Sequence, residues 1–375
     1  MTKILSRSFM LLIVFCTYAC QNETNIQNKI EAVQANNEHS NTGHIDFLKS
    51  MAPIIAFHQN NLPKQQFKIQ ANTFQKLQSK GGVVLHINPD DLICTDRSAL
   101  DKELIVEIIE LTNQKELLKA NAQTVSDGRL LESGGAYHIS ITSNNKQVQL
   151  KQGRTMTIDF PKIKDVAMEL FYGERDSLSI VNWKPAGQSF IVRTEEKIKQ
   201  EPIEIYETTE EMPLIEEVGV VLEDSLVKTK RIQSSQKITK QYNELQILNQ
   251  NMYEQIRVNQ LGWINVDRFI NEPMSDLLFT INPNDSIDVA VVYLVYKSMN
   301  SLQTINYIAA FNPFQNKLKI ALGKDIRLIV LTYKNNTYYA YESNFKTEAT
   351  NTKEITFTPY TEEKVKALFN KQITK

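Results

Sequence analysis

The side chains best suited to chemistry are His138 and Ser140, which are separated by one apolar residue. Alternate side chains of an extended strand point to the same side, so this pair would share one face. A histidine can remove the proton of a nearby hydroxyl, and the oxygen can then attack the preceding carbonyl. Thr142 would lie on the same face, however, which is typical of a solvated polar row. Because the motif is only three residues long, we favour the solvated row.

A second polar group lies in the segment Leu261-Gly-Trp-Ile-Asn-Val-Asp-Arg-Phe269. Trp263 could be an aromatic platform for a ligand or partner, with Asp267 and Arg268 as its polar contacts. In the structural alternative, Gly262 permits a close approach, Trp263 fills the core, and Asp267 pairs with Arg268 or caps a turn. We favour the structural alternative because large aromatic residues are highly buried on average.

The chain shows no complete motif for a metal or a cofactor, and we expect neither. Asp90, Asp91 and Asp96 could offer oxygens to calcium, but they lack the spacing and the closing glutamate of a calcium loop, so a solvated turn is expected. Cys94 is the single cysteine outside the first twenty residues, so it can form neither an internal disulfide nor a structural zinc site. It lies in an apolar run, and we expect it to be a small core residue rather than a nucleophile.

The first twenty residues resemble a bacterial lipoprotein signal. Lys3 and Arg7 form a short basic head, and the apolar run Phe9–Cys16 is too short to be a permanent membrane span. The run ends at Thr17-Tyr-Ala-Cys20, where a small residue precedes a cysteine, although an aliphatic residue usually stands at the position of Thr17. Ordinary secretion with a chance cysteine is the alternative. We expect Cys20 to be lipidated after residues 1–19 are removed.

Residues 20–45 are predicted to be a disordered tether, because they are rich in Asn, Gln and Glu and have too few large apolar residues to offset the entropy of folding. A lipid on Cys20 would place the protein in the cell envelope, on the outer membrane. The expected partners are therefore the membrane, through the lipid, and another envelope protein. No nucleic-acid partner is expected, because 42 Lys and Arg against 43 Asp and Glu leave no basic excess.

Residues 46–193 are predicted to be a β-sandwich domain. Leu104–Leu111 is its strongest strand, because its β-branched residues favour a strand over a helix. A tight turn is expected at Gly134-Gly135. The strand after it should bury Tyr137, Ile139 and Ile141 on one face.

The order of several segments resembles the ZU5/GAIN-like β-sandwich of bacterial cell-envelope lipoproteins. These segments are Gly81-Gly82, Val106–Glu110, Thr124–Gly135 and Gly153–Pro161. Leu261–Phe269 is similar to a signature that recurs in the same group. The resemblance implies a sandwich fold and an envelope location, but no known catalytic residues. Some ZU5 and GAIN domains cleave themselves before the Ser or Thr of a His-hydrophobe-Ser/Thr tripeptide, which would correspond here to the Ile139–Ser140 bond.

The second half is predicted to be a linker followed by another sandwich. Residues 194–252 are charged and interrupted by prolines, with a helical segment near their end, and residues 253–375 form the second domain. Ile326–Tyr333 is expected to form a hairpin with Tyr338–Glu342. Thr361 is expected to cap a C-terminal helix whose apolar face carries Val365, Leu368 and Phe369.

The sequence therefore predicts a mainly β protein with two β-sandwich-like domains, a short linking helix and a C-terminal helix. The expected function is that of a non-enzymatic, lipid-anchored envelope protein for surface display, adhesion or assembly with another envelope component. The first alternative is a self-cleaving domain that uses His138 and Ser140. The second is a carbohydrate- or peptide-binding accessory lipoprotein, in which Trp263, Asp267 and Arg268 would be the binding residues.

Overall fold

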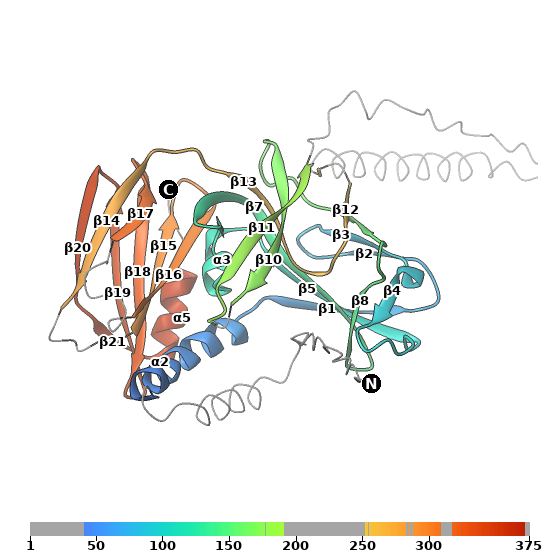
Figure 1. The fold of residues 1–375 in the computed structure, drawn as a ribbon, viewed down its shortest axis with the longest axis horizontal. Helices are drawn as coiled ribbons and strands as arrows, with labels where there is room; N and C mark the ends of the chain where they lie inside the picture. The colour runs from blue at the N-terminus through green and yellow to red at the C-terminus, as the bar shows by residue number, and fades with distance from the viewer. Residues whose placement is uncertain are drawn as a thin grey trace, which may run out of the picture.

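In a computed structural model, the alternating apolar segments form two β-sandwiches that share a third core, so the predicted mainly β fold is confirmed (Figure 1). The structure describes residues 41–176, 178–190, 252–253, 255–282, 285, 287, 289–308 and 317–371. The predicted signal, the lipidation site Cys20, most of the tether and nearly all of the predicted linker lie outside these residues.

The first sandwich pairs a nine-stranded sheet with a four-stranded sheet. The larger sheet has the order β1-β5-β7-β13-β10-β11, with β4, β6 and β8 beside this path. Its strands are β1 (Lys64–Gln70), β4 (Leu92–Cys94), β5 (Glu103–Leu111), β6 (Val125–Ser126), β7 (Arg129–Ser143), β8 (Lys146–Leu150), β10 (Met168–Arg175), β11 (Val181–Phe190) and β13 (Gly262–Phe269). The smaller sheet has the order β12-β9-β3-β2 and consists of β2 (Gln75–Gln78), β3 (Val84–Ile87), β9 (Met156–Asp159) and β12 (Ile256–Val258).

The core of the first sandwich lies between these two sheets. Tyr137, Ile139 and Ile141 of β7 are fully buried there with Leu85 of β3, so their predicted common face is confirmed. Burying each such side chain contributes about 1.5–3 kcal/mol. Cys94 is fully buried in the same core, as expected.

The turn predicted at Gly134-Gly135 is wrong, because β7 continues through both residues from Arg129 to Ser143. A Cβ on Gly135 would lie 2.4 Å from the hydroxyl oxygen of Tyr137, and one on Gly134 would lie 2.9 Å from the carbonyl oxygen of Val266. The pairing of β7 with β13 shifts by one residue at this place. The glycines therefore permit close packing at a β-bulge instead of reversing the chain.

The predicted start of the second domain at residue 253 also differs from the structure. β13 lies inside the first sandwich, where it pairs with β7 on one side and with β10 on the other. β12 pairs with β9 of the smaller sheet. Ile264 and Val266 of β13 are fully buried in the first core. Packing against strands that are distant in the sequence therefore places β13 in the first sandwich.

The second sandwich pairs a five-stranded sheet, in the order β16-β15-β18-β19-β21, with a three-stranded sheet, in the order β17-β14-β20. Its strands are β14 (Met274–Ile281), β15 (Val289–Tyr296), β16 (Ser301–Ile308), β17 (Lys317–Ala321), β18 (Asp325–Lys334), β19 (Thr337–Lys346), β20 (Thr350–Ile355) and β21 (Thr358–Tyr360). The predicted hairpin is confirmed as β18–β19, and its turn residues Asn335 and Asn336 both have positive φ.

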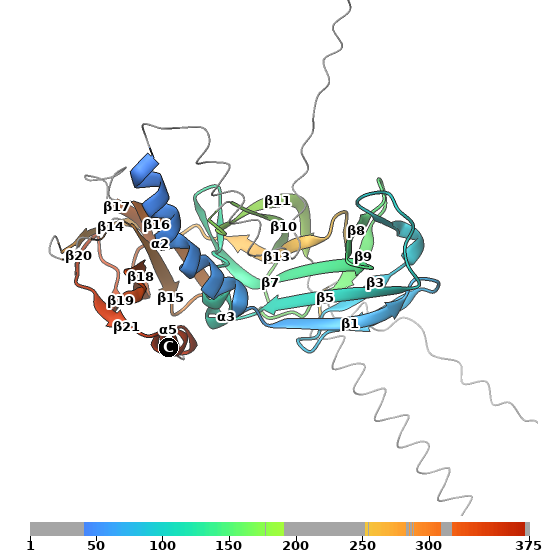
Figure 2. The same cartoon turned by 90° about the horizontal axis from the view of Figure 1, so that it is seen from below.

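A third core joins the two sandwiches and contains a helix that the sequence did not predict. Helix α2 (Asn41–Asn60) lies across the five-stranded sheet against β15 and β18 (Figure 2). Its Met51, Ile54 and Phe57 pack in one cluster with residues of both sandwiches. Residues 41–45, which we assigned to the tether, therefore belong to this helix. Tertiary packing stabilises this helix. Neither the sequence pattern nor the interior Pro53 indicated a helix here.

Two more helices line the third core, and one of them is the predicted C-terminal helix. α5 (Glu362–Asn370) begins at its cap Thr361, and it buries Val365, Leu368 and Phe369, so the C-terminal helix is confirmed. α3 (Gln114–Lys119) follows β5 and lies against β15 and β16. No helix in the described part of the chain is both long and apolar enough to cross a membrane.

His58 connects α2 to three other elements of this core. Its Nδ1 lies 2.8 Å from the carbonyl oxygen of Lys119 in α3, and its Nε2 lies 2.7 Å from the hydroxyl of Tyr293 in β15. Its ring stacks on Phe369 of α5, with centroids 5.6 Å apart. Burial lowers the pKa of His58 to about 4, so the imidazole is neutral at pH 7.

Acidification should therefore weaken the fold through His58. Between the unfolded pKa of 6.5 and the folded value of about 4, the unfolded chain binds more protons than the folded chain. The contribution of His58 to the free energy of unfolding is complete above pH 6.5 and falls by about 2 kcal/mol at pH 5. Urea unfolding of the wild type and of His58→Gln, at pH 8 and pH 5, measures this difference. An equal pH dependence in the two proteins would contradict it.

Candidate functional site

The strand pair β7–β13 carries the candidate catalytic residues His138 and Ser140 and the candidate binding residues Trp263, Asp267 and Arg268. His138 and Ser140 lie in a regular stretch of β7, opposite Ile109 and Glu107 of β5. On the other side of β7, His138 is directly opposite Trp263 of β13. The structure therefore brings together two segments that are more than a hundred residues apart in the sequence.

His138 packs against the tryptophan and not against the predicted nucleophile. Its ring centroid lies 4.9 Å from that of Trp263, and its Nδ1 is buried and forms no hydrogen bond with the residues described. Burial lowers the pKa of His138 to about 4, so the ring is neutral at pH 7. A general base must reach the proton it removes, and no hydrogen bond joins this Nδ1 to Ser140.

Trp263 belongs to a cluster of aromatic and cationic groups. The guanidinium of Arg175 lies 4.4 Å from its ring centroid, and the ring of Trp183 lies edge-on at 6.4 Å. Arg175 also donates hydrogen bonds to the carbonyl oxygens of Ala120 and Asn121 at the end of α3. The cation–π contact and these backbone bonds hold β10, β13 and α3 together.

Asp267 lies in a buried polar network where the two sandwiches meet. Asn265 donates a hydrogen bond of 2.5 Å to Asp267 Oδ2, and Ser133 donates one of 3.2 Å to Asn265. Asn300, in the turn between β15 and β16, donates from its side chain to the carbonyl oxygen of Ser133. We call Ser133, Asn265, Asp267 and Asn300 the junction network, because it joins β7 and β13 to the second sandwich.

Asp267 is fully buried, and burial raises the pKa of its carboxyl well above the usual 3.8. The hydrogen bond from Asn265 opposes this shift but does not cancel it. Oδ1 of Asp267 has no hydrogen-bond partner among the described residues. Asp267 therefore keeps its proton to a higher pH than an exposed aspartate does, and in that form it is a neutral hydrogen-bonding group.

Arg268 does not pair with Asp267, in contrast to the structural pairing suggested above. Neighbouring side chains of a strand point to opposite faces, and Arg268 instead donates two hydrogen bonds, of 2.9 Å and 2.6 Å, to Glu132 Oε2 of β7. Lys164 also donates to Glu132. Burial raises the pKa of Glu132, but these two cations outweigh it and leave the pKa below its usual value. Gly262 has a φ of 108° and no close neighbour, so conformation rather than close approach explains this glycine.

The predicted calcium candidates are separate turn residues. Asp91 pairs with Arg154, and Asp96 pairs with Lys146 and accepts hydrogen bonds from Ser98. No group of three or more His, Cys, Asp or Glu residues that could hold a metal occurs in the part of the chain described here.

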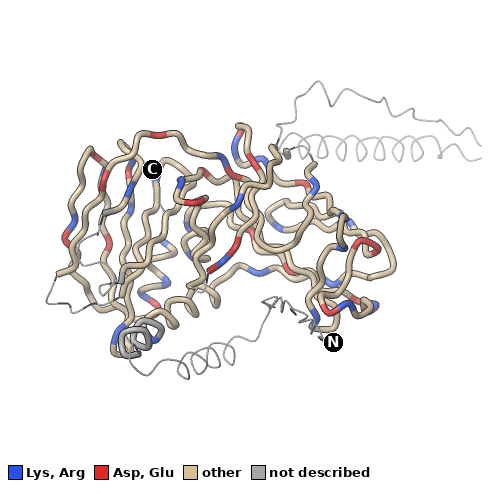
Figure 3. Tube along the Cα trace, viewed as in Figure 1, with Lys and Arg blue, Asp and Glu red and all other residues tan. Residues whose placement is uncertain are grey.

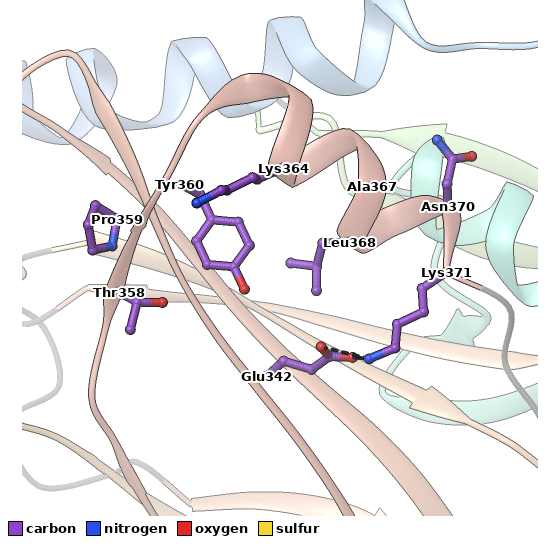
Figure 4. A pocket seen from close by; sticks show the side chains of 9 residues that line it. All are labelled: Glu342, Thr358, Pro359, Tyr360, Lys364, Ala367, Leu368, Asn370 and Lys371. Carbon is purple, nitrogen blue, oxygen red and sulfur yellow. Dashed lines mark hydrogen bonds and ion pairs between the residues drawn. The ribbon is translucent and has the colours of Figure 1, made fainter.

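A shallow pocket of about 800 Å³ lies between α5 and the strands β19 and β21 (Figure 4). Pro359, Tyr360 and Leu368 form its apolar walls, and Lys364 and Lys371 supply positive charge. No sequence motif predicted this pocket. Most of its lining residues lie near the end of the sequence, but Glu342 lies on β19. No local motif marks such a combination.

Comparison with known proteins adds no assignment. No family model matches the chain, and no curated protein matches it. The resemblance to ZU5/GAIN-like lipoproteins therefore stays a prediction.

Proposed function

We propose that this chain is a lipid-anchored cell-envelope protein whose joined β-sandwiches serve surface display, adhesion or assembly with another envelope component. The observation that carries the proposal is the leader pattern, in which a basic head and a short apolar run end at Cys20. A lipid at Cys20 would hold the protein on the outer membrane.

The first described element after Cys20 supports this proposal. α2 begins at Asn41 and is part of the third core, where the hydroxyl of Tyr338 also donates to the carbonyl oxygen of Pro53. The intervening residues can span at most about 70 Å. A lipid at Cys20 would therefore keep the start of α2 within this distance of the membrane surface.

The internal contacts of the candidate polar residues count against both alternative functions. Arg268 is paired with Glu132, Asp267 is buried in the junction network, and His138 is packed against Trp263. Self-cleavage at the Ile139–Ser140 bond finds no support in this geometry, because β7 pairs regularly with β5 on both sides of that bond. No exposed aromatic row that would favour carbohydrate binding occurs among the described residues; Phe74 is the one strongly exposed aromatic side chain there.

Cys20→Ser should release the protein from the membrane. Expressed in a bacterial host with lipoprotein processing, the wild type is expected in the membrane pellet and the variant in the soluble fraction, because a serine cannot carry the thioether-linked lipid. Mass spectrometry of the mature wild type should show the lipid on residue 20. Cys16→Ser is the matched control and should behave like the wild type. Membrane retention of Cys20→Ser would refute the proposal.

A further inference from the structure

The pocket beside α5 has a surplus of positive charge at a defined place. Glu342 is the one carboxylate among its lining residues, and it already binds two cations. Arg327, buried beneath it, donates to Glu342 Oε1 at 2.7 Å, and Lys371 Nζ lies 3.1 Å from both carboxylate oxygens. Lys364 forms no ion pair with a described residue and is exposed at the pocket. Three cations therefore face one carboxylate.

Contacts within the fold fix the position of Arg327, one of the three cations. The side chain of Arg327 is only 3% exposed and donates its second hydrogen bond, of 2.6 Å, to the carbonyl oxygen of Leu368 in α5. Burial raises the pKa of Glu342, but hydrogen bonds from Arg327 and Lys371 more than offset it, so the carboxylate stays charged and holds both cations. Elsewhere in the described chain, charges of both signs are interspersed (Figure 3).

The rest of the pocket is apolar and open. In Figure 4, Tyr360, Leu368 and the Glu342–Lys371 ion pair border one space, with Pro359 at its edge. Ala367 of α5 adds only a methyl group, which leaves room on the helix side. The volume is within the range of small-molecule sites, about 300–1,000 Å³.

We propose that this pocket binds a small organic anion, with its carboxylate or phosphate group at Lys364 and Lys371 and its apolar part against Tyr360 and Leu368. Lysine ammonium groups suit either anion as point charges. The apolar walls favour an organic anion over the inorganic ion, because they gain from burial of its hydrocarbon part.

The proposal is tested with phenyl phosphate, titrated into the full mature chain in non-ionic detergent and followed by ligand-observed NMR. Saturable binding with a dissociation constant of about 1 mM is expected. Inorganic phosphate and uncharged benzyl alcohol should each bind at least about tenfold more weakly, because each lacks one half of the recognised chemistry. Binding should also weaken as salt is raised.

Variants locate the site. Lys364→Glu should weaken phenyl phosphate at least about tenfold by charge reversal, and Ala367→Phe should weaken it similarly by filling the pocket. Lys80→Glu makes the same charge change on an exposed turn of the first sandwich and should leave binding unchanged. Circular dichroism and urea midpoints verify the fold, and Lys364→Ala replaces Lys364→Glu if the latter unfolds. No saturation, equal losses in Lys364→Glu and Lys80→Glu, or unchanged binding in Ala367→Phe would overturn the proposal.

Discussion

Asp267→Asn is expected to make the protein more stable than the wild type at neutral pH, although it alters a fully buried side chain of the junction network. The folded carboxyl has a pKa well above 3.8, so the native state keeps a proton that the unfolded chain releases. The contribution of Asp267 is complete below pH 3.8 and is lost as the pH rises toward the folded pKa, by about 1.4 kcal/mol per pH unit. The amide of the variant keeps the shape of the neutral carboxyl and does not titrate.

Urea unfolding of Asp267→Asn and the wild type from pH 4 to pH 8 would measure this effect. The two stabilities should be similar near pH 4 and should diverge as the pH rises, with the variant the more stable. Asp165→Asn removes an exposed carboxylate and should follow the wild type within about 0.5 kcal/mol. A variant that is less stable than the wild type at pH 7 would mean that Asp267 is ionised in the fold and compensated by a partner.

Gly173→Val is expected to destabilise the protein by about 4 kcal/mol, because the tryptophan cluster occupies the space of any side chain at this position. A Cβ on Gly173 would lie 2.6 Å from the ring of Trp183 and 2.8 Å from both Trp263 Cβ and a methyl of Val181. These neighbours belong to β11 and β13, which flank β10 on both sides, so neither can move without disturbing the sheet. Overpacking of this kind forces side chains away from their preferred rotamers.

Tryptophan fluorescence reports directly on this prediction, since the chain has two tryptophans and both lie in the cluster. The variant should show a lower urea midpoint and an altered emission in its folded state. Ser189→Val adds the same side chain at an exposed position of β11 and should change stability by less than about 0.5 kcal/mol. If Gly173→Val matched this control, the packing described around Gly173 would be incorrect.

The burial and pairing of the candidate polar residues also bear on the proposed function. Asp267, Arg268 and His138 are the groups that a sequence-based search selects for chemistry, and the fold surrounds each of them with internal partners or buries it. The site proposed for an organic anion instead uses Lys364, a surface residue without any motif around it. In the proposed function, recognition would depend on the shape and charge of surfaces rather than on these three groups.

Local patterns allowed part of the fold to be predicted. Tyr137, Ile139 and Ile141 alternate because a strand exposes one face and buries the other. Asn335 and Asn336 mark a hairpin because asparagine tolerates positive φ, and Thr361 marks a helix start because its hydroxyl accepts from the backbone N–H of Lys364. Each of these signals depends on a few neighbouring residues.

Only the tertiary structure shows which segments pack together. The alternation of β13 is equally compatible with either sandwich, and only the buried places of Ile264 and Val266 beside β7 and β10 assign it to the first. α2 and the Arg268–Glu132 pair likewise depend on contacts far apart in sequence. The strand alternation in β7, the turn of the β18–β19 hairpin and the cap at Thr361 could be predicted from the residues, because they follow from short-range sterics and hydrogen bonding. The shared core, the raised pKa of Asp267 and the cationic pocket required the three-dimensional arrangement, because burial and electrostatics depend on every neighbour in space.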